Sequence, residues 1–150
     1  MSLFARENAM VALYNKLIAG GRFKTTGRRL ILWTKVKEQP ALFLRHIGDD
    51  VPARRTGLPP KVVMEAEAWL YSSAGDDPDI SPETELNELL DRVEIALQPA
   101  PGFEVQTLGG LVTHAWIEGK IDMHPGDLGG QAIAIVPIRM LVPILHGPLG

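Results

Sequence analysis

Histidines with acidic residues nearby are the side chains in this sequence best suited to chemistry, either as metal ligands or as acid–base pairs. His114 and Glu118 would meet on a helix, but on a strand four positions separate them by about 13 Å. His124 and Asp127, in the segment HPGD, would supply only half of the ligands of a tetrahedral zinc site. The sequence therefore predicts no metal site at either pair.

Other catalytic or cofactor-binding patterns are equally weak. His46 followed by Asp49 and Asp50 is more typical of a solvated turn than of a metal site. The glycine pairs that begin at positions 20, 109 and 129 lack the strand, helix and Lys-Ser/Thr of a phosphate-binding loop. No histidine or acid stands in a recognisable triad relation to Ser72, Ser73 or Ser81. We expect no cofactor and no catalytic residue.

The concentrated basic positions are Arg28-Arg29 and Arg54-Arg55. They could contact phosphate, but a pI of about 5.8 lacks the positive excess typical of a nucleic-acid-binding domain. Ion pairing with acidic neighbours is the alternative. The acidic residues that fit such pairing are Asp76, Asp77, Asp79, Glu83 and Glu85.

Charge is divided between the two halves of the chain. Residues 1–75 contain 12 Lys/Arg and 6 Asp/Glu, a net +6, whereas residues 76–150 contain 3 and 12, a net −9. One interpretation is that a single domain interleaves both halves and most charges meet water. The other is that opposite surfaces carry opposite charge, so that identical subunits attract head to tail, as in rings or filaments.

Length and composition indicate one domain over residues 1–150, large enough to bury a core without disulfides. The chain has no cysteine, which excludes thiol catalysis and Cys-based metal centres and is compatible with a reducing compartment. Arg6 and Glu7 interrupt the region where a signal peptide needs its apolar stretch. An intracellular location is the resulting expectation.

The elements that must position these residues begin with an amphipathic helix over 3–19, ended by Gly20-Gly21. A strand over 22–33, interrupted at Gly27, and a second strand over 40–47 follow it. Residues 48–61, rich in Gly, Pro and charge, predict a loop.

Residues 61–73 alternate with a period of two, which favours a strand, although helix propensity over 64–71 competes. Ser81 and Pro82 then predict a helix start, and acidic residues follow where the helix dipole favours them. The apolar stripe of this helix is Leu86, Leu89, Leu90, Val93 and Leu97.

The last third of the chain predicts a strand over 111–123, a turn over 124–130 and a closing strand, paired as an antiparallel hairpin. From Ala132 to Leu145 the closing segment is apolar on both faces. It is too short for a membrane helix and contains Pro137 and Arg139, so a strand covered on both sides fits it better.

The predicted fold is therefore α+β, a mainly antiparallel sheet of about five strands with two helices on one face, in the order α-β-β-β-α-β-β. Two helices on one face leave the second face of the closing strand open. A loop, a curling strand or another subunit must cover it, and we favour another subunit. Ile133 and Ile135 are the expected interface residues on this strand.

The sequence resembles a known family over roughly residues 7–143. The segments that carry the resemblance are QPALFL at 39–44, TELNELLDRVEIAL at 84–97 and QTLGGLVTHAWIEGKIDMHPGDLGGQAIAIVPIRMLVP at 106–143. They are similar to the tail-terminator proteins of long-tailed bacteriophages and prophages, also called minor tail protein U-like proteins. None of these segments is a catalytic motif.

The resemblance implies a structural virion protein and no enzyme. Six copies would form a hexameric ring on the head-proximal end of the tail tube, end tube polymerisation and offer a docking surface to head-tail completion proteins. DNA would pass through the lumen without specific binding, and no membrane is involved. The implied location is the virion tail after assembly in the host cytoplasm.

The divided charge and the doubly apolar strand fit such a ring, because a closed heterologous ring needs two complementary surfaces. Arg54-Arg55 and the stretch Asp76–Asp79 are expected to contact neighbouring subunits or the tube. The alternatives are another neck or tail protein (a head-tail joining protein or a tube subunit), a small oligomeric α+β enzyme, and a small-ligand or nucleic-acid-binding module.

Overall fold

The computed structural model describes residues 4–20, 22–52, 57, 60–73, 79–81, 83–124 and 131–144. Within them the chain forms an α+β fold, as the sequence predicts. Its elements are α1 (Ala5–Ala19), β1 (Thr25–Gly27), a short 3-10 turn η1 (Trp33–Lys35), β2 (Ala41–Asp50), β3 (Lys61–Ser73), α2 (Glu83–Ala96), β4 (His114–Ile117), β5 (Asp122–His124) and β6 (Gln131–Pro143).

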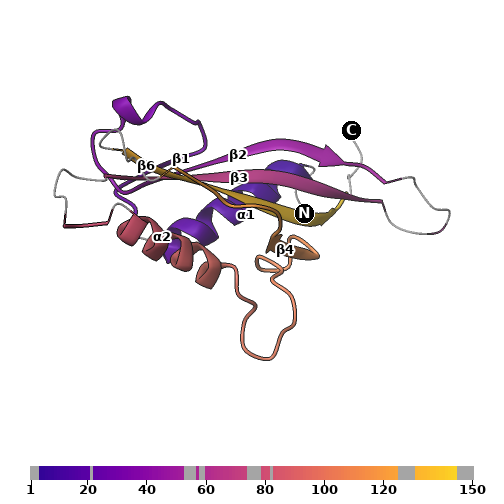
Figure 1. Cartoon of the computed structure of the whole chain (residues 1–150). Helices are drawn as coiled ribbons and strands as arrows, with labels where there is room; N and C mark the ends of the chain where they lie inside the picture. The colour runs from indigo at the N-terminus through magenta and orange to yellow at the C-terminus, as the bar shows by residue number, and fades with distance from the viewer. Residues whose placement is uncertain are drawn as a thin grey trace.

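The strands form one six-stranded sheet in the order β1-β2-β3-β6-β4, with β5 also paired to β6. Among the strands that the structure describes, only the β1–β2 pair is parallel, and the other pairs are antiparallel. The two longest strands, β3 and β6, pair over their whole length, from Lys61 opposite Pro143 to Ser73 opposite Gln131. We call this pair the central ribbon (Figure 1).

Both helices pack on one face of the sheet, which we call the inner face (Figure 1). Alternate residues of the central ribbon point into it and are buried with the apolar stripes of the helices, so the predicted strand alternation is confirmed. The buried ribbon residues are Val62, Met64, Ala66, Ala68, Leu70, Ala132, Ala134, Val136, Ile138, Met140 and Val142. The helices contribute Ala9, Met10, Leu13 and Leu17 from α1 and Leu86, Leu89, Leu90 and Val93 from α2.

The opposite side of the sheet, the outer face, is covered at one end by the segment between β1 and β2. Val36 of this segment is buried with Phe43 and Tyr71, and Leu30 and Ile31 pack against the same cluster. In Figure 1 this segment, which includes η1, lies on the side of the sheet away from the helices. A loop therefore supplies part of the cover that the doubly apolar closing strand requires.

This cover explains why the strand predicted over 22–33 is wrong in length. Only Thr25–Gly27 pairs with β2. A Cβ atom at Gly27 would lie 3.3 Å from the ring of Phe43, so the chain passes closely over that ring. It then leaves the sheet to place its apolar residues on the outer face.

The second strand is longer than predicted, because β2 continues to Asp50 through a register shift between His46 and Gly48. The loop predicted over 48–61 is therefore wrong at its two ends, since Lys61 already belongs to β3. The competing helix over 64–71 is wrong as well, because these residues pair on both sides in the sheet.

The strand predicted over 111–123 is wrong as a single element. It is divided into β4 and β5, which both pair with β6. Gly119 between them has a φ of +112°, which L-residues rarely adopt, and an added Cβ would lie 3.4 Å from Pro137. The break lies beside Pro137 of β6, and it raises the number of strands to six.

In the described part of the chain, no helix is long and apolar enough to cross a membrane.

Candidate subunit-contact surface

The uncovered part of the outer face begins with a charged and aromatic group at the middle of β2 and β3. Arg45 lies opposite Glu67, and its Nε and Nη2 donate to the same Glu67 oxygen at 2.9 and 2.8 Å. Trp69 Nε1 donates to that oxygen at 3.2 Å, and the Arg45 guanidinium lies 5.4 Å from the centre of the Trp69 ring. One carboxylate thus holds both the arginine and the indole in place.

A second charged group lies further along the central ribbon. Arg139 of β6 lies opposite Glu65, with 3.4 Å between Nη2 and Oε1, and its Nη1 is 2.8 Å from Glu118 Oε2. Trp116 of β4 also lies opposite Arg139, and its ring stacks on His114 with ring centres 4.9 Å apart. His114 and Glu118 therefore have different partners within the chain.

These ion pairs are partly exposed, so each contributes about 0–1 kcal/mol to folding. They lie among partly buried apolar residues of β6, which are Ile135, Pro137 and Leu141. Both α-helices pack on the opposite face of the sheet. A surface that mixes partly buried aromatic, aliphatic and paired charged groups is suited to a protein contact.

The two isoleucines predicted as interface residues have different surroundings. Ile133 lies opposite Tyr71 and packs in the cluster under the β1–β2 segment, so it is used within the chain. Ile135 lies opposite Trp69 and Asp122 and stays partly exposed. Both side chains are only partly buried, so both isoleucines remain candidates for an intersubunit contact.

Tyr71 marks the boundary between the covered and open parts of the outer face. Its hydroxyl donates to the Ile31 carbonyl at 2.8 Å, and its ring lies 5.6 Å from that of Phe43. Burial raises the pKa of the Tyr71 phenol above its ordinary value.

Most of the charged residues predicted to form contacts lie outside the described residues: Arg54, Arg55, Asp76 and Asp77. Asp79 is described and lies exposed just before α2. Ser81 acts at the helix start as predicted, since the Glu83 N–H donates to its hydroxyl at 3.4 Å. Pro82, predicted at the same helix start, also lies outside the described residues.

The residues His46, Asp49 and Asp50, predicted as a solvated turn, lie instead on β2. Asp49 Oδ2 is 2.5 Å from Arg6 Nε, and Asp49 Oδ1 is 2.5 Å from His46 Nε2, so the carboxylate joins α1 to the sheet. Burial acts to raise the pKa of Asp49, but the hydrogen bonds and charges of Arg6 and His46 outweigh it and hold the pKa below its ordinary value. No group of three potential metal ligands occurs among the described residues.

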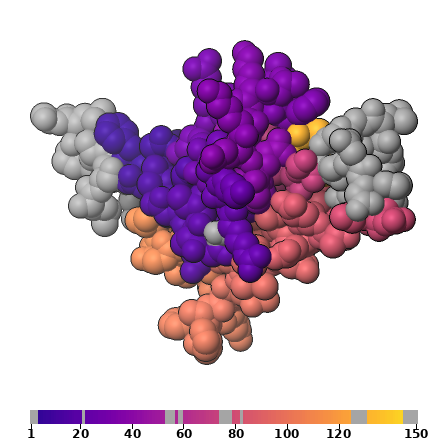
Figure 2. All heavy atoms as spheres, turned by 90° about the vertical axis from the view of Figure 1, so that its left-hand side faces the viewer, coloured from indigo at the N-terminus to yellow at the C-terminus, as the bar shows by residue number. Residues whose placement is uncertain are grey.

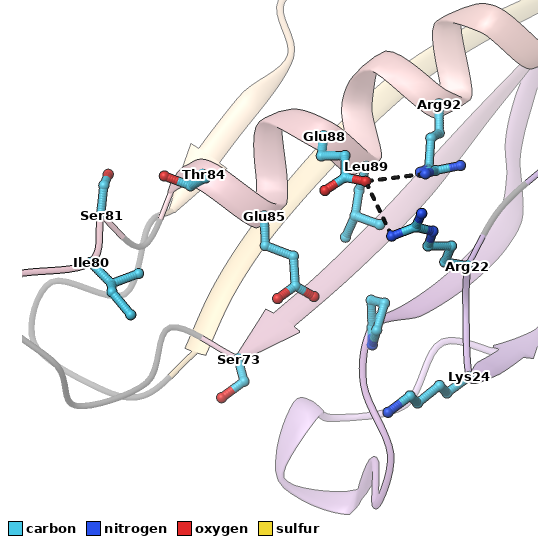
Figure 3. Close-up of a pocket in the computed structure, with 11 residues that line it drawn as sticks. Arg22, Lys24, Ser73, Ile80, Ser81, Thr84, Glu85, Glu88, Leu89 and Arg92 are labelled. Atoms are coloured by element: carbon cyan, nitrogen blue, oxygen red, sulfur yellow. Dashed lines mark hydrogen bonds and ion pairs between the residues drawn. The ribbon is translucent and has the colours of Figure 1, made fainter.

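A cleft of about 420 Å³ lies between the first turns of α2 and the end of the sheet (Figure 3). Three of its charged groups pair with one another, since Glu88 lies 3.1 Å from Arg92 and 3.7 Å from Arg22. Lys24 and Glu85 also line the cleft. Ser73 and Ser81 also line it, but the part of the chain that the structure describes places no histidine there. The described residues that line this cleft form no acid–base or nucleophile arrangement.

The structure also shows an element that sequence reasoning missed, the ordered loop between α2 and β4. The side chain of Gln106 is buried; its Nε2 donates to the Gln98 carbonyl at 2.8 Å, and its Oε1 accepts from the Leu108 N–H at 3.0 Å. Its backbone carbonyl accepts from the Ala115 N–H at 2.9 Å. A glutamine among glycines and prolines has no periodicity that could have marked it.

No model of a known protein family matches this chain, and no curated protein sequence matches it either.

Proposed function

We propose that this chain is a structural virion subunit of the tail-terminator kind. Six copies form a ring on the head-proximal end of a tail tube, end its polymerisation and present a surface to head-tail completion proteins. The proposal rests on the resemblance of residues 106–143 to that family and on an α+β fold built around the same segment.

The observation that carries the proposal is the open part of the outer face. Trp69, Trp116 and Ile135 are partly exposed there, on strands whose other face is closed by both helices. Aromatic side chains beside paired charges are enriched where proteins meet, since they bury large areas with few rotatable bonds. A neighbouring subunit or the tube would complete the cover that the β1–β2 segment begins.

In this proposal the protein catalyses no reaction and binds no cofactor. DNA passes through the lumen of the ring without being read, which suits a net charge of −3 because the ring then has little attraction for phosphates. The protein is assembled in the host cytoplasm and ends in the virion.

The test is co-assembly with the cognate tail tube protein. Tubes grown with the purified chain are expected to stop at a uniform length and to carry a sixfold cap at one end in negative-stain images. The variant Ile135→Asp on the outer face should cap less often, whereas Asn15→Asp on the exposed side of α1 should cap normally.

Three results would count against the proposal. Uncapped tubes in the presence of folded protein would reject the terminator role. Long cylinders made of this chain alone would identify a tube subunit instead, and turnover of a substrate by the assembled protein would identify an enzyme.

A further inference from the structure

One exposed patch lies on the segment between β1 and β2. Leu32 and Trp33 are 67% and 41% exposed at its tip. Around them lie the exposed cations Arg29, Lys35 and Lys37, none of which has an ion-pair partner among the described residues. We call these five residues the basic patch. It combines apolar area with unpaired positive charge, although the protein as a whole is acidic.

A second patch lies on α2 and the loop that follows it. Ile95 and Phe103 are 63% and 69% exposed. Asp91 stands three positions before Glu94 and four before Ile95, the spacings at which residues are neighbours on a helix surface, and all three are exposed. Glu104 follows Phe103 in the loop. These three carboxylates also lack an ion-pair partner within the described chain. We call this set the acidic patch.

The two patches lie on opposite sides of the molecule. The β1–β2 segment lies beyond the outer face, whereas the loop after α2 projects from the helix side (Figure 1). In the view turned by 90° the same two segments stand at the top and the bottom of the surface (Figure 2). Surfaces that differ and face apart cannot pair around a twofold axis but can join copies head to tail.

Both patches stand on ordered supports. The basic patch is fastened by the Tyr71–Ile31 hydrogen bond and by a 2.8 Å hydrogen bond from Thr25 Oγ1 to the Glu38 carbonyl. The loop of the acidic patch is held by Gln106. Preformed surfaces lose less conformational entropy when they bind, so each contact retains more of its free energy.

We propose that the basic patch of one copy docks on the acidic patch of the next. Leu32 and Trp33 pack against Ile95 and Phe103, and the three cations face the three carboxylates. The partner is a second copy of this chain, since one sequence carries both complementary surfaces. This inference rests on the proposed function, because the proposed sixfold ring is what closes the row of head-to-tail contacts.

Each patch is defined by five residues, whereas a standard stable interface involves about 20–30 residues on each side. The contact is therefore small for an isolated dimer. In a closed ring every copy makes the contact twice, and the last contact forms within one assembly at high effective concentration. Association is therefore expected to rise steeply with protein concentration and to weaken with salt.

Because the chain has no cysteine, engineered disulfides test this contact cleanly. The double variant Leu32→Cys with Phe103→Cys, oxidised at high protein concentration, is expected to give a ladder of linked species that ends at a closed ring. The control, Leu32→Cys with Lys120→Cys, places the second thiol at an exposed position outside both patches. Equal cross-linking of the two double variants would overturn the proposal.

Charge exchange supplies a second readout on the same double-cysteine background. The pair Lys35→Glu and Lys37→Glu should reduce the ladder about tenfold, and the added pair Asp91→Lys and Glu94→Lys should restore it. Loss without restoration would reject the charge complementarity. If instead the Lys35 and Lys37 changes abolish salt-dependent DNA binding and leave cross-linking unchanged, the basic patch is a phosphate-binding surface and the proposal is wrong.

Failure here and failure of the proposed function give different results. A ladder without capped tubes would support this contact and reject the terminator role. Capped tubes whose subunits do not cross-link between positions 32 and 103 would support that role and reject this contact.

Discussion

Alternate residues of β3 and β6 build both faces of the central ribbon, yet the two faces meet different surroundings. On the inner face, residues such as Ala134, Ile138 and Met140 are fully buried under α1 and α2. On the outer face, neighbouring residues such as Ile135 and Arg139 are partly exposed and lie beside paired charges. An apolar sequence on both sides of a strand thus does not imply two equal cores.

The difference shows where free energy for folding and for association is available. The inner face contributes folding stability, because its side chains leave water completely when the monomer forms. Ile135 and Trp69 on the outer face leave water only in part, and the remaining area can be buried by another molecule. For the proposed ring, the outer face is therefore the side on which we expect a substitution to impair assembly with little effect on the fold.

The largest expected effect compares two isoleucines of β6. Ile138→Ala on the inner face should lower the free energy of unfolding by about 2–5 kcal/mol, since it leaves a cavity in a closed core. Ile135→Ala on the outer face should lower it by about 1 kcal/mol because the side chain is already partly hydrated. Urea denaturation of both variants measures the contrast, and equal losses would contradict the distinction between the faces.

Next in size is the effect of removing the buried amide that orders the loop after α2. Gln106→Leu should cost about 1–3 kcal/mol, because the buried Leu108 N–H loses its acceptor. Amide hydrogen exchange at Leu108 should accelerate in parallel. Gln98→Ala is the matched control, since it keeps the backbone carbonyl to which Gln106 donates; a similar loss in this control would remove the role assigned to the Gln106 side chain.

A smaller effect is expected from the ion pair of the outer face. A double-mutant cycle with Arg45→Met and Glu67→Gln should give a coupling free energy of about 0.2–1 kcal/mol, since both side chains remain partly hydrated. The coupling should fall further in high salt. A coupling several times larger would mean that this face is as closed as the inner one.

The smallest effect is the ionisation of the boundary residue Tyr71, which does not change the free energy of unfolding at neutral pH because the phenol is protonated there. The chain has 2 tyrosines, so Tyr14→Phe makes Tyr71 the only one. Its absorbance titration should show a pKa above 10.0, because burial disfavours the phenolate. The part of the free energy of unfolding that depends on the neutral Tyr71 phenol is fully present below about pH 10. It is lost as the pH rises through the raised pKa of Tyr71. A titration at or below the ordinary value would mean that the β1–β2 segment does not cover this ring.

Elements with a strong local period could be predicted from the sequence. The strand over 61–73 and the apolar stripe from Leu86 to Val93 match the structure because alternation and helical spacing follow from backbone geometry alone. The α+β class followed from the number and order of these elements. The bounds of an element differ from the prediction where strand pairing sets them: β2 continues through charged residues to Asp50 because β3 lies beside it.

The candidate surface was predictable only in part. The doubly apolar character of the closing strand directed attention to Ile133 and Ile135, and the structure leaves both of them partly buried. Ile133 packs against the cluster under the β1–β2 segment, whereas Ile135 lies opposite Trp69 and Asp122. Gln106 and the two exposed patches had no sequence signal, because their roles depend on residues far away in the chain. The contacts of Arg54, Arg55, Asp76 and Asp77 stay predictions.

The sequence by itself determined which segments are helical or extended and that both sides of the closing strand are apolar, since these properties depend on the order of neighbouring residues. The tertiary structure decided which side the helices close and how far the segment after Gly27 covers the other. It also decided which charges meet across the strands. Those outcomes depend on register and on contacts between distant residues, which periodicity does not encode.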